Sequence, residues 1–259
     1  MPHQAVIEST PQFNRVPKVT VDFWLIKLMA VTMGETAADY LAKSMGFGLV
    51  GTTAFMSAVL AIALYFQFAQ KRYVPATYWA AVVLISIVGT LFTDCLIDTF
   101  NVRLLVTTIV FTIILGLTFM MWSNSEGTLS IHSIFTRRRE IFYWVAILFT
   151  FSLGTAAGDL VAEKFGVGYL FTGMLFAAIV GSFAVGYRVF KLNAILMFWL
   201  AYIFTRPLGA SFGDLLSQPL EYGGLGLGTV VTSVIFLTCI SALVVYMTMN
   251  YQRDEQVLT

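Results

Sequence analysis

The sequence predicts an all-α integral membrane protein with eight transmembrane helices, arranged as four parallel two-helix repeats. The composition is 58% hydrophobic and only 11% charged, whereas soluble domains contain about 25% charged residues. Eight apolar stretches approach or exceed the roughly 20 residues that a helix needs to cross a bilayer. A short motif recurs four times at regular spacing. These observations exclude an ordinary soluble protein and make the lipid bilayer the expected partner.

The eight predicted spans follow one another with short polar connections between them. They cover residues 21–43, 48–70, 76–98, 101–123, 140–163, 168–190, 192–217 and 225–250. Residues 1–20 and 251–259 form the predicted cytoplasmic tails. The first tail lacks the apolar core and cleavage site of a signal peptide, so we expect the first span to be retained.

The distribution of Lys and Arg predicts the orientation of the spans. Ten of these residues fall in the tails and the connections expected on the same side, and three fall on the opposite side. Because cytoplasmic loops are enriched in Lys and Arg, we expect both termini to be cytoplasmic. No basic segment is long enough to suggest a nucleic-acid partner.

The recurring motif is an aromatic–Trp pair, with a Gly ten residues after the Trp and an Asp five residues later. Four of the five Trp in the chain belong to it. The copies are Phe23-Trp24, Gly34, Asp39; Tyr78-Trp79, Gly89, Asp94; Tyr143-Trp144, Gly154, Asp159; and Phe198-Trp199, Gly209, Asp214. Each copy begins a pair of spans, so all four repeats enter the membrane in the same direction. We therefore expect the first helices of the four pairs to surround one axis, unlike inverted repeats.

The spacing between copies also suggests an older duplication. The steps from Asp39 to Asp159 and from Asp94 to Asp214 are both 120 residues. The sequence then divides into two four-helix halves, residues 21–122 and 141–250, joined by a cytoplasmic linker at residues 123–140.

The motif predicts the depth of its members in the membrane. Fifteen helical residues rise about 22 Å, and the hydrocarbon layer is about 30 Å thick. Trp24, Trp79, Trp144 and Trp199 are expected to act as interface anchors on the cytoplasmic side. The four Asp would then lie at one level in the outer part of the layer.

Carboxylates inside a membrane need compensation, because each costs about 2.5 to 3.5 kcal/mol at mid-membrane. Glu35 lies one helical turn from Asp39 and adds a fifth acid. Lys27 and Arg206 are the bases available inside the membrane, because the other Lys and Arg are assigned to the two membrane sides, and we expect them to compensate charge or to act as gates. We expect Arg206, which precedes Pro207, to bridge the Asp carboxylates or to bind a substrate anion. The excess of acids over bases indicates binding of protons or cations.

Oxygen-rich groups surround these acids and favour hard divalent cations such as Mn²⁺, Mg²⁺ or Ca²⁺. The proposed ion ligands, and tentative metal ligands, are Glu35, Asp39, Asp94, Asp159 and Asp214. The supporting polar residues are Thr32, Thr36, Thr90, Thr155 and Ser211. The competing interpretation is structural: Asp39 with Lys43 could form a pair near the outer interface, and the Asp could hydrate helix ends.

A family resemblance rests on four stretches: "KVTVDFWLIKLMAVTMGETAADYL", "YWAAVVLISIVGTLFTDCL", "YWVAILFTFSLGTAAGDLV" and "FWLAYIFTRPLGASFGDLL". Together they resemble a bacterial membrane-protein family known as a domain of unknown function with four tandem repeats, each of two spans with a characteristic Trp. The resemblance implies a location in the bacterial inner membrane and does not imply an activity.

The leading hypothesis is a small secondary transporter of a cation, namely a divalent metal, with protons as a coupling ion. The alternative is a non-transporting membrane sensor or assembly protein whose carboxylates are structural. We expect no enzymatic activity and no required cofactor. Homo-oligomerisation is left open by the sequence.

Overall fold

The computed structural model describes residues 13–44 and 46–258, with side chains up to residue 250. This part of the chain consists of helices and connections and contains no strands. The eight long helices are α1 (Val21–Ser44), α2 (Gly48–Ala69), α3 (Pro75–Asp94), α4 (Leu104–Glu126), α5 (Arg137–Asp159), α6 (Tyr169–Arg188), α7 (Ala194–Ser217) and α8 (Thr229–Leu258). Four short helices connect or extend them, namely η1 (Cys95–Thr99), η2 (Ile131–Ser133), η3 (Leu160–Lys164) and η4 (Leu220–Tyr222).

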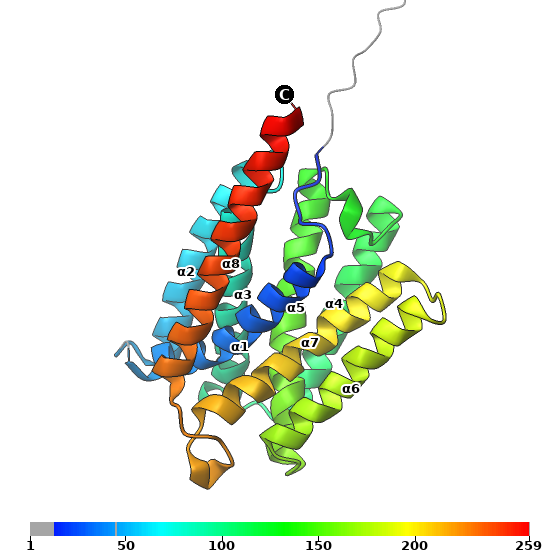
Figure 1. Cartoon of the computed structure of the whole chain (residues 1–259). Coiled ribbons are helices and arrows are strands. Elements are labelled where there is room, and N and C mark those ends of the chain that lie inside the picture. The colour runs from blue at the N-terminus through cyan, green and yellow to red at the C-terminus, as the bar shows by residue number, and fades with distance from the viewer. Residues whose placement is uncertain (1–12, 45, 259) are drawn as a thin grey trace, which may run out of the picture.

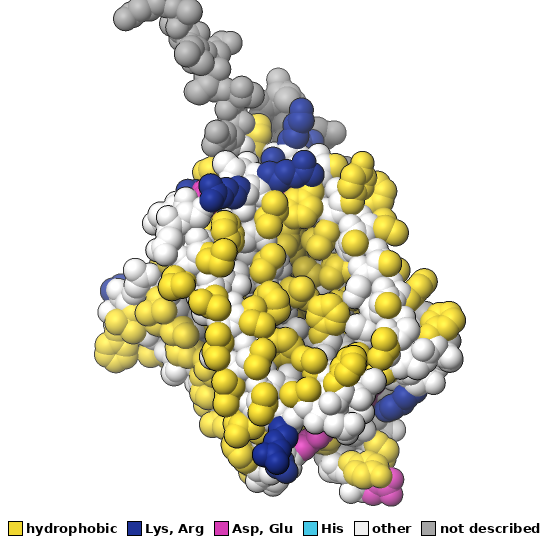
Figure 2. Space-filling model, turned by 180° about the vertical axis from the view of Figure 1, so that it is seen from behind, with side chains coloured by type: hydrophobic (Ala, Val, Ile, Leu, Met, Phe, Trp, Pro, Cys, Tyr) yellow, Lys and Arg dark blue, Asp and Glu magenta, His cyan; other side chains and the backbone are white. Residues whose placement is uncertain are grey.

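The protein is a multi-pass membrane protein. Within the described residues, seven helices are long and apolar enough to cross a bilayer, and α1 is the long helix outside this set. With 24 residues α1 has sufficient length, but Lys27, Glu35 and Asp39 reduce its apolar character. Figure 2 shows hydrophobic side chains over the middle of one face, with charged side chains gathered toward its upper and lower ends.

The first helices of the four repeats form a closed ring. In this ring α1 packs against α3, α3 against α5, α5 against α7, and α7 against α1. Half or more of each of these four helices is buried, whereas α2, α4, α6 and α8 are mostly exposed. The four ring helices therefore form the interior of the protein, and the outer helices cover it.

The outer helices link neighbouring repeats. The second helix of a repeat packs mainly against the first helix of the next repeat: α2 against α3, α4 against α5, α6 against α7, and α8 back against α1. The ring is thus closed by the last helix of the chain, and no repeat is an independent unit.

The motif Gly residues allow the ring helices to approach closely. A Cβ on Gly34 would lie 1.9 Å from Ser86 Oγ, and a Cβ on Gly154 would lie 2.2 Å from Arg206 Cγ. Every contact joins the Gly of one repeat to the residue seven positions after the Trp of the next repeat; the pairs are Gly34–Ser86, Gly89–Phe151, Gly154–Arg206 and Gly209–Val31. This regularity shows that the four contacts are equivalent and explains why the motif contains Gly.

Both ends of the described chain lie at the same end of the helix bundle, which we call the terminal end (Figure 1). There the backbone carbonyl of Asn14 accepts a hydrogen bond from Tyr73 N at 3.0 Å, and its side-chain amide donates to the carbonyl of Ile131 at 3.0 Å. Arg15 Nη1 donates to the buried Glu140 Oε2 at 2.6 Å. The segment before α1 therefore ties the start of α3, the linker and α5 together.

Candidate functional site

Arg206 lies at the centre of the ring and contacts all three other repeats. Its side chain is fully buried. Nη2 donates to Glu35 Oε2 at 3.0 Å, to Thr155 Oγ1 at 2.9 Å, and also to Thr90 Oγ1. Nη1 donates to the Val31 carbonyl at 2.9 Å. The guanidinium thus forms an ion pair with one repeat and hydrogen bonds with all three.

The partners of Arg206 occupy one equivalent position. Glu35, Thr90 and Thr155 each lie eleven residues after the Trp of their repeats, and the corresponding residue of the fourth repeat is Ala210. Thr90 Oγ1 and Thr155 Oγ1 also donate to Glu35 Oε2, at 3.2 and 3.5 Å, which gives that carboxylate two neutral donors beside Arg206. We call Arg206, Glu35, Thr90 and Thr155 the central cluster. We expected Arg206 to bridge Asp carboxylates, but its hydrogen-bonded carboxylate is that of Glu35.

Lys27 is the second buried base and lies toward the terminal end of α1. Its Nζ donates to the Tyr202 carbonyl at 2.7 Å and lies 4.1 Å from the centre of the Tyr202 ring. Lys27 Nζ and Arg206 Cζ each lie 5.7 Å from the centre of the Phe151 ring. The negative ring face favours both cations, but Lys27 has no carboxylate partner within the described residues.

Aromatic residues close the ring toward the terminal end. The cluster comprises Phe23, Trp24, Tyr78, Trp79, Tyr143, Trp144, Phe198, Trp199 and Tyr202. The Tyr78 and Tyr143 hydroxyls are hydrogen-bonded to each other. Tyr202, above Lys27, stacks on Phe151. This aromatic cluster separates the central cluster from the terminal end.

The four motif Trp differ from their expected role as anchors in the lipid interface. Trp79, Trp144 and Trp199 are buried, and Trp24 is half-buried. Trp199 Nε1 donates to the Leu129 carbonyl at 2.9 Å. The buried rings of Trp79, Trp144 and Trp199 fill the space between the ring helices and pack against protein rather than lipid headgroups, whereas Trp24 is partly exposed.

The four Asp lie beyond the central cluster, at or near the opposite ends of the ring helices. Asp214 is buried, and Asp39, Asp94 and Asp159 are half-buried. Asp94, Asp159 and Asp214 each lie within electrostatic range of Glu35. In the described part of the chain these three side chains have no hydrogen-bond donor and no basic ion-pair partner, although Arg206 lies within electrostatic range of Asp159. We call Glu35 and the four Asp the carboxylate layer.

Asp39 differs from the other three Asp because it has two partners. Gln218 Nε2 donates to Asp39 Oδ2 at 3.2 Å, and Lys43 Nζ lies 3.6 Å from the same oxygen. The structure therefore contains the Asp39–Lys43 pair of the structural interpretation. Gln218 was not among the expected residues, since it follows α7 and lies outside the repeated motif.

The tentative metal ligands do not form a metal centre in this conformation. Among the described residues, no three His, Cys, Asp or Glu side chains lie close enough together to hold one ion. Glu35 lies one helical turn closer to the centre of the ring than Asp39 and pairs with Arg206. Asp39 instead accepts a hydrogen bond from Gln218 and pairs with Lys43.

The supporting polar residues have three different environments. Thr90 and Thr155 belong to the central cluster. Thr32 donates to the Leu28 carbonyl at 3.0 Å, and Thr36 contacts Ser233 Oγ at 2.7 Å. Ser211 is buried, and its hydroxyl has no hydrogen-bond partner in the described part of the chain.

The helix changes its winding directly after two of the Asp. Asp94 and Asp159 are the last residues of α3 and α5, and the π-helical turns η1 and η3 begin at the next residue. Such turns often occur at functional sites. They lie at equivalent positions of the second and third repeats, directly after the motif Asp.

A family model described as "Repeat of Unknown Function (DUF347)" matches the chain four times. The matches cover residues 23–73, 77–128, 142–191 and 197–251. The chain belongs to the DUF347 family. Each match contains one helix of the ring and the outer helix that follows it, so the DUF347 repeat is the two-helix unit described above. The comparison found no matching curated protein and no matching solved structure.

Proposed function

We propose that this DUF347 protein is a secondary transporter of a cation, with protons as the coupling ion. The observation that carries the proposal is the carboxylate layer, in which Asp94, Asp159 and Asp214 lie near Glu35 without basic ion-pair partners of their own. We place the protein in the bacterial inner membrane, with all eight helices crossing it and both termini in the cytoplasm.

The charge balance supports this proposal. If all groups are ionised, the carboxylate layer carries five negative charges and has two direct positive partners, Arg206 at Glu35 and the exposed Lys43 at Asp39. Isolated carboxylates are costly in a membrane. Protons or a bound cation would remove this cost, and exchange between them would couple cation movement to proton movement.

In the present conformation, the central cluster would block the passage of a cation through the ring. A cation that reached the carboxylate layer from the far end would meet the buried Arg206 and then the aromatic cluster. Passage would require Arg206 to leave Glu35 or the ring helices to shift. We therefore assign Arg206 the role of a gate and Glu35 that of the innermost ion ligand.

The cation is expected to be hard, because the layer offers carboxylate and hydroxyl oxygens. Mn²⁺, Mg²⁺ and Ca²⁺ are the first candidates. Water molecules would have to complete the coordination, since the carboxylates do not form a cluster of three.

The test is cation flux into liposomes with an internal pH-sensitive dye and an internal metal-sensitive dye. The wild type should move one of the candidate cations and protons in opposite directions, and Asp94→Asn and Asp159→Asn should reduce both signals to those of empty liposomes. Glu221→Gln is the matched control, because Glu221 is an exposed acid in η4. Folded Asp variants with wild-type flux would refute the proposal.

The alternative of an assembly protein is favoured by one observation: Arg206 connects all four repeats. It predicts that the wild type carries no cation flux and that substitutions in the central cluster release or unfold the helices. The same liposome assay therefore separates the two functions.

A further inference from the structure

A cleft of about 930 Å³ lies outside the ring, toward the terminal end. The beginning of α1, the linker, the last turns of α6 and the first half of α7 line it. In Figure 1 these segments are the upper part of α1, the green linker and the yellow ends of α6 and α7. The cleft does not include any residue of the carboxylate layer.

The two parts of the cleft differ in chemistry. Leu28, Phe183 and Leu208 belong to its apolar wall, whereas Arg188 and His132 belong to its polar part. Arg188 is exposed and forms no ion pair or hydrogen bond with another described residue. None of the described residues that line the cleft is Asp or Glu. An apolar wall beside an unpaired cation is complementary to an anionic amphiphile.

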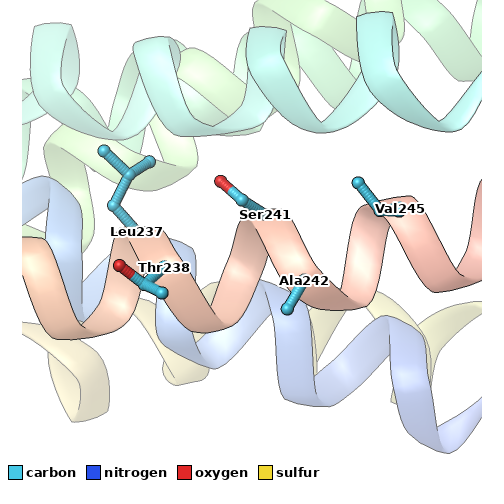
Figure 3. A pocket seen from close by; sticks show the side chains of 5 residues that line it. All are labelled: Leu237, Thr238, Ser241, Ala242 and Val245. Carbon is cyan, nitrogen blue, oxygen red and sulfur yellow. The ribbon is translucent and has the colours of Figure 1, made fainter.

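The cleft differs in this respect from a second hollow, along α8. Figure 3 shows that the residues lining the second hollow, from Leu237 to Val245, all come from that one helix. It has no charged group and is an ordinary lipid-facing surface, so it does not indicate a particular ligand.

We propose that the cleft binds one anionic phospholipid from the leaflet at the terminal end. Its phosphate would contact Arg188 and His132, and an acyl chain would lie against Leu28, Phe183 and Leu208. The volume is at the upper end of the range for small-molecule pockets, about 300 to 1,000 Å³, so the cleft has room for a headgroup and part of an acyl chain. A lipid fits better than a water-soluble anion, because the apolar wall continues onto exposed surface residues such as Leu25 and Val185.

The site lies beside the helix that holds the central cluster. Thr205 and Leu208 line the cleft, and Arg206 lies between them in sequence with its side chain directed inward. An acyl chain in the cleft would therefore pack against the outside of α7 at the level of Arg206. Lipid occupancy should stabilise this part of the ring.

The test is native mass spectrometry of the full chain in detergent, titrated separately with phosphatidylglycerol, phosphatidylcholine and glycerol phosphate. We expect phosphatidylglycerol to bind most tightly. A basic residue near a membrane surface contributes about 1 kcal/mol to anionic-lipid binding, so Arg188→Gln should weaken this binding about fivefold. Lys71→Gln is the control, because Lys71 is an exposed base outside the cleft.

A second variant tests the apolar wall. Ala201 lines the cleft, so Ala201→Trp should exclude both phospholipids, and a thermal melt would establish that this variant is folded. Equal affinity for the two phospholipids, unchanged binding by Arg188→Gln, competition by glycerol phosphate at equal concentration, or a second copy of the chain in place of lipid would each overturn the proposal.

Discussion

At the scale of single residues, Arg206 is the one charged side chain at its position in the four repeats, and it places a positive charge at the centre of the ring. The equivalent residues of the other repeats are Val31, Ser86 and Phe151, none of which is charged. At the position of Glu35, Thr90 and Thr155, the fourth repeat has the small residue Ala210, which leaves room for the Arg206 side chain. One arginine therefore satisfies Glu35, Thr90 and Thr155 simultaneously.

A double-mutant cycle on Glu35 and Arg206 tests this arrangement. Breaking a buried ion pair from one side costs about 3 to 5 kcal/mol, because the remaining charge has no partner. Glu35→Gln and Arg206→Gln should each lower the free energy of unfolding by about this amount, and the double variant should lose less than their sum. The measurement is reversible unfolding in mixed micelles.

The control for the cycle is Lys43→Gln, which breaks the exposed pair with Asp39. Lys43 is 71% exposed, and pairs of this kind contribute about 0 to 1 kcal/mol. Additive losses for Glu35 and Arg206 would contradict a direct energetic coupling between them.

The sequence predicted several of these residues but not their pairing. Lys27, Glu35 and Arg206 stood out because charges are rare in spans, and Thr90 and Thr155 because they lie near the motif. Arg206 was expected to reach the Asp carboxylates, yet the four-residue step from Glu35 to Asp39 places Glu35 nearer. Alignment of the four repeats at the eleventh residue after the Trp would have grouped Glu35, Thr90 and Thr155, although it would not have included Arg206, which is the seventh residue after its Trp.

At the scale of helices, the motif Gly and Trp have complementary packing roles. Gly lets one ring helix approach the next, and Trp fills the wider space toward the terminal end. The sequence predicted the helices well, because apolar length is a strong signal. It did not predict that the Trp would be buried, because an aromatic ring near a membrane boundary fits either lipid headgroups or a protein interior.

The Gly contact makes a prediction for Gly154→Ala. The added Cβ would lie 2.2 Å from Arg206 Cγ and 2.4 Å from its Cβ, and overpacking of this kind costs about 1 to 3 kcal/mol. The melting temperature should fall, since α5 and α7 cannot keep their present distance. Thermal unfolding in detergent measures this change.

Gly116→Ala is the matched control for Gly154→Ala. Gly116 is also helical, in α4, and a Cβ there would meet nothing within 4 Å. We expect no loss of stability for this control, because the added methyl group meets no neighbour. A Gly154→Ala protein as stable as the control would show that the ring helices are not held at close contact.

At the scale of the whole molecule, the four repeats form one closed structure with one polar centre. Each outer helix packs on the next repeat, and α8 completes the ring on α1. The twofold relation between the four-helix halves remains a prediction from spacing. The link between the N-terminal segment and Glu140 had no repeated signal, so it was visible only in the structure.

In the proposed function, Glu35 and the four Asp form one layer of charge that protons or a cation must neutralise. The most direct measurement is the unfolding free energy at pH 8 and pH 5, with and without each candidate cation. At about 100 times its dissociation constant, the bound cation should stabilise the wild type by about 2.7 kcal/mol. This gain should shrink at pH 5, where protons compete for the carboxylates, and vanish when all four Asp are Asn. Cation stabilisation that is absent from the wild type, or retained by a folded four-Asn variant, would contradict the account.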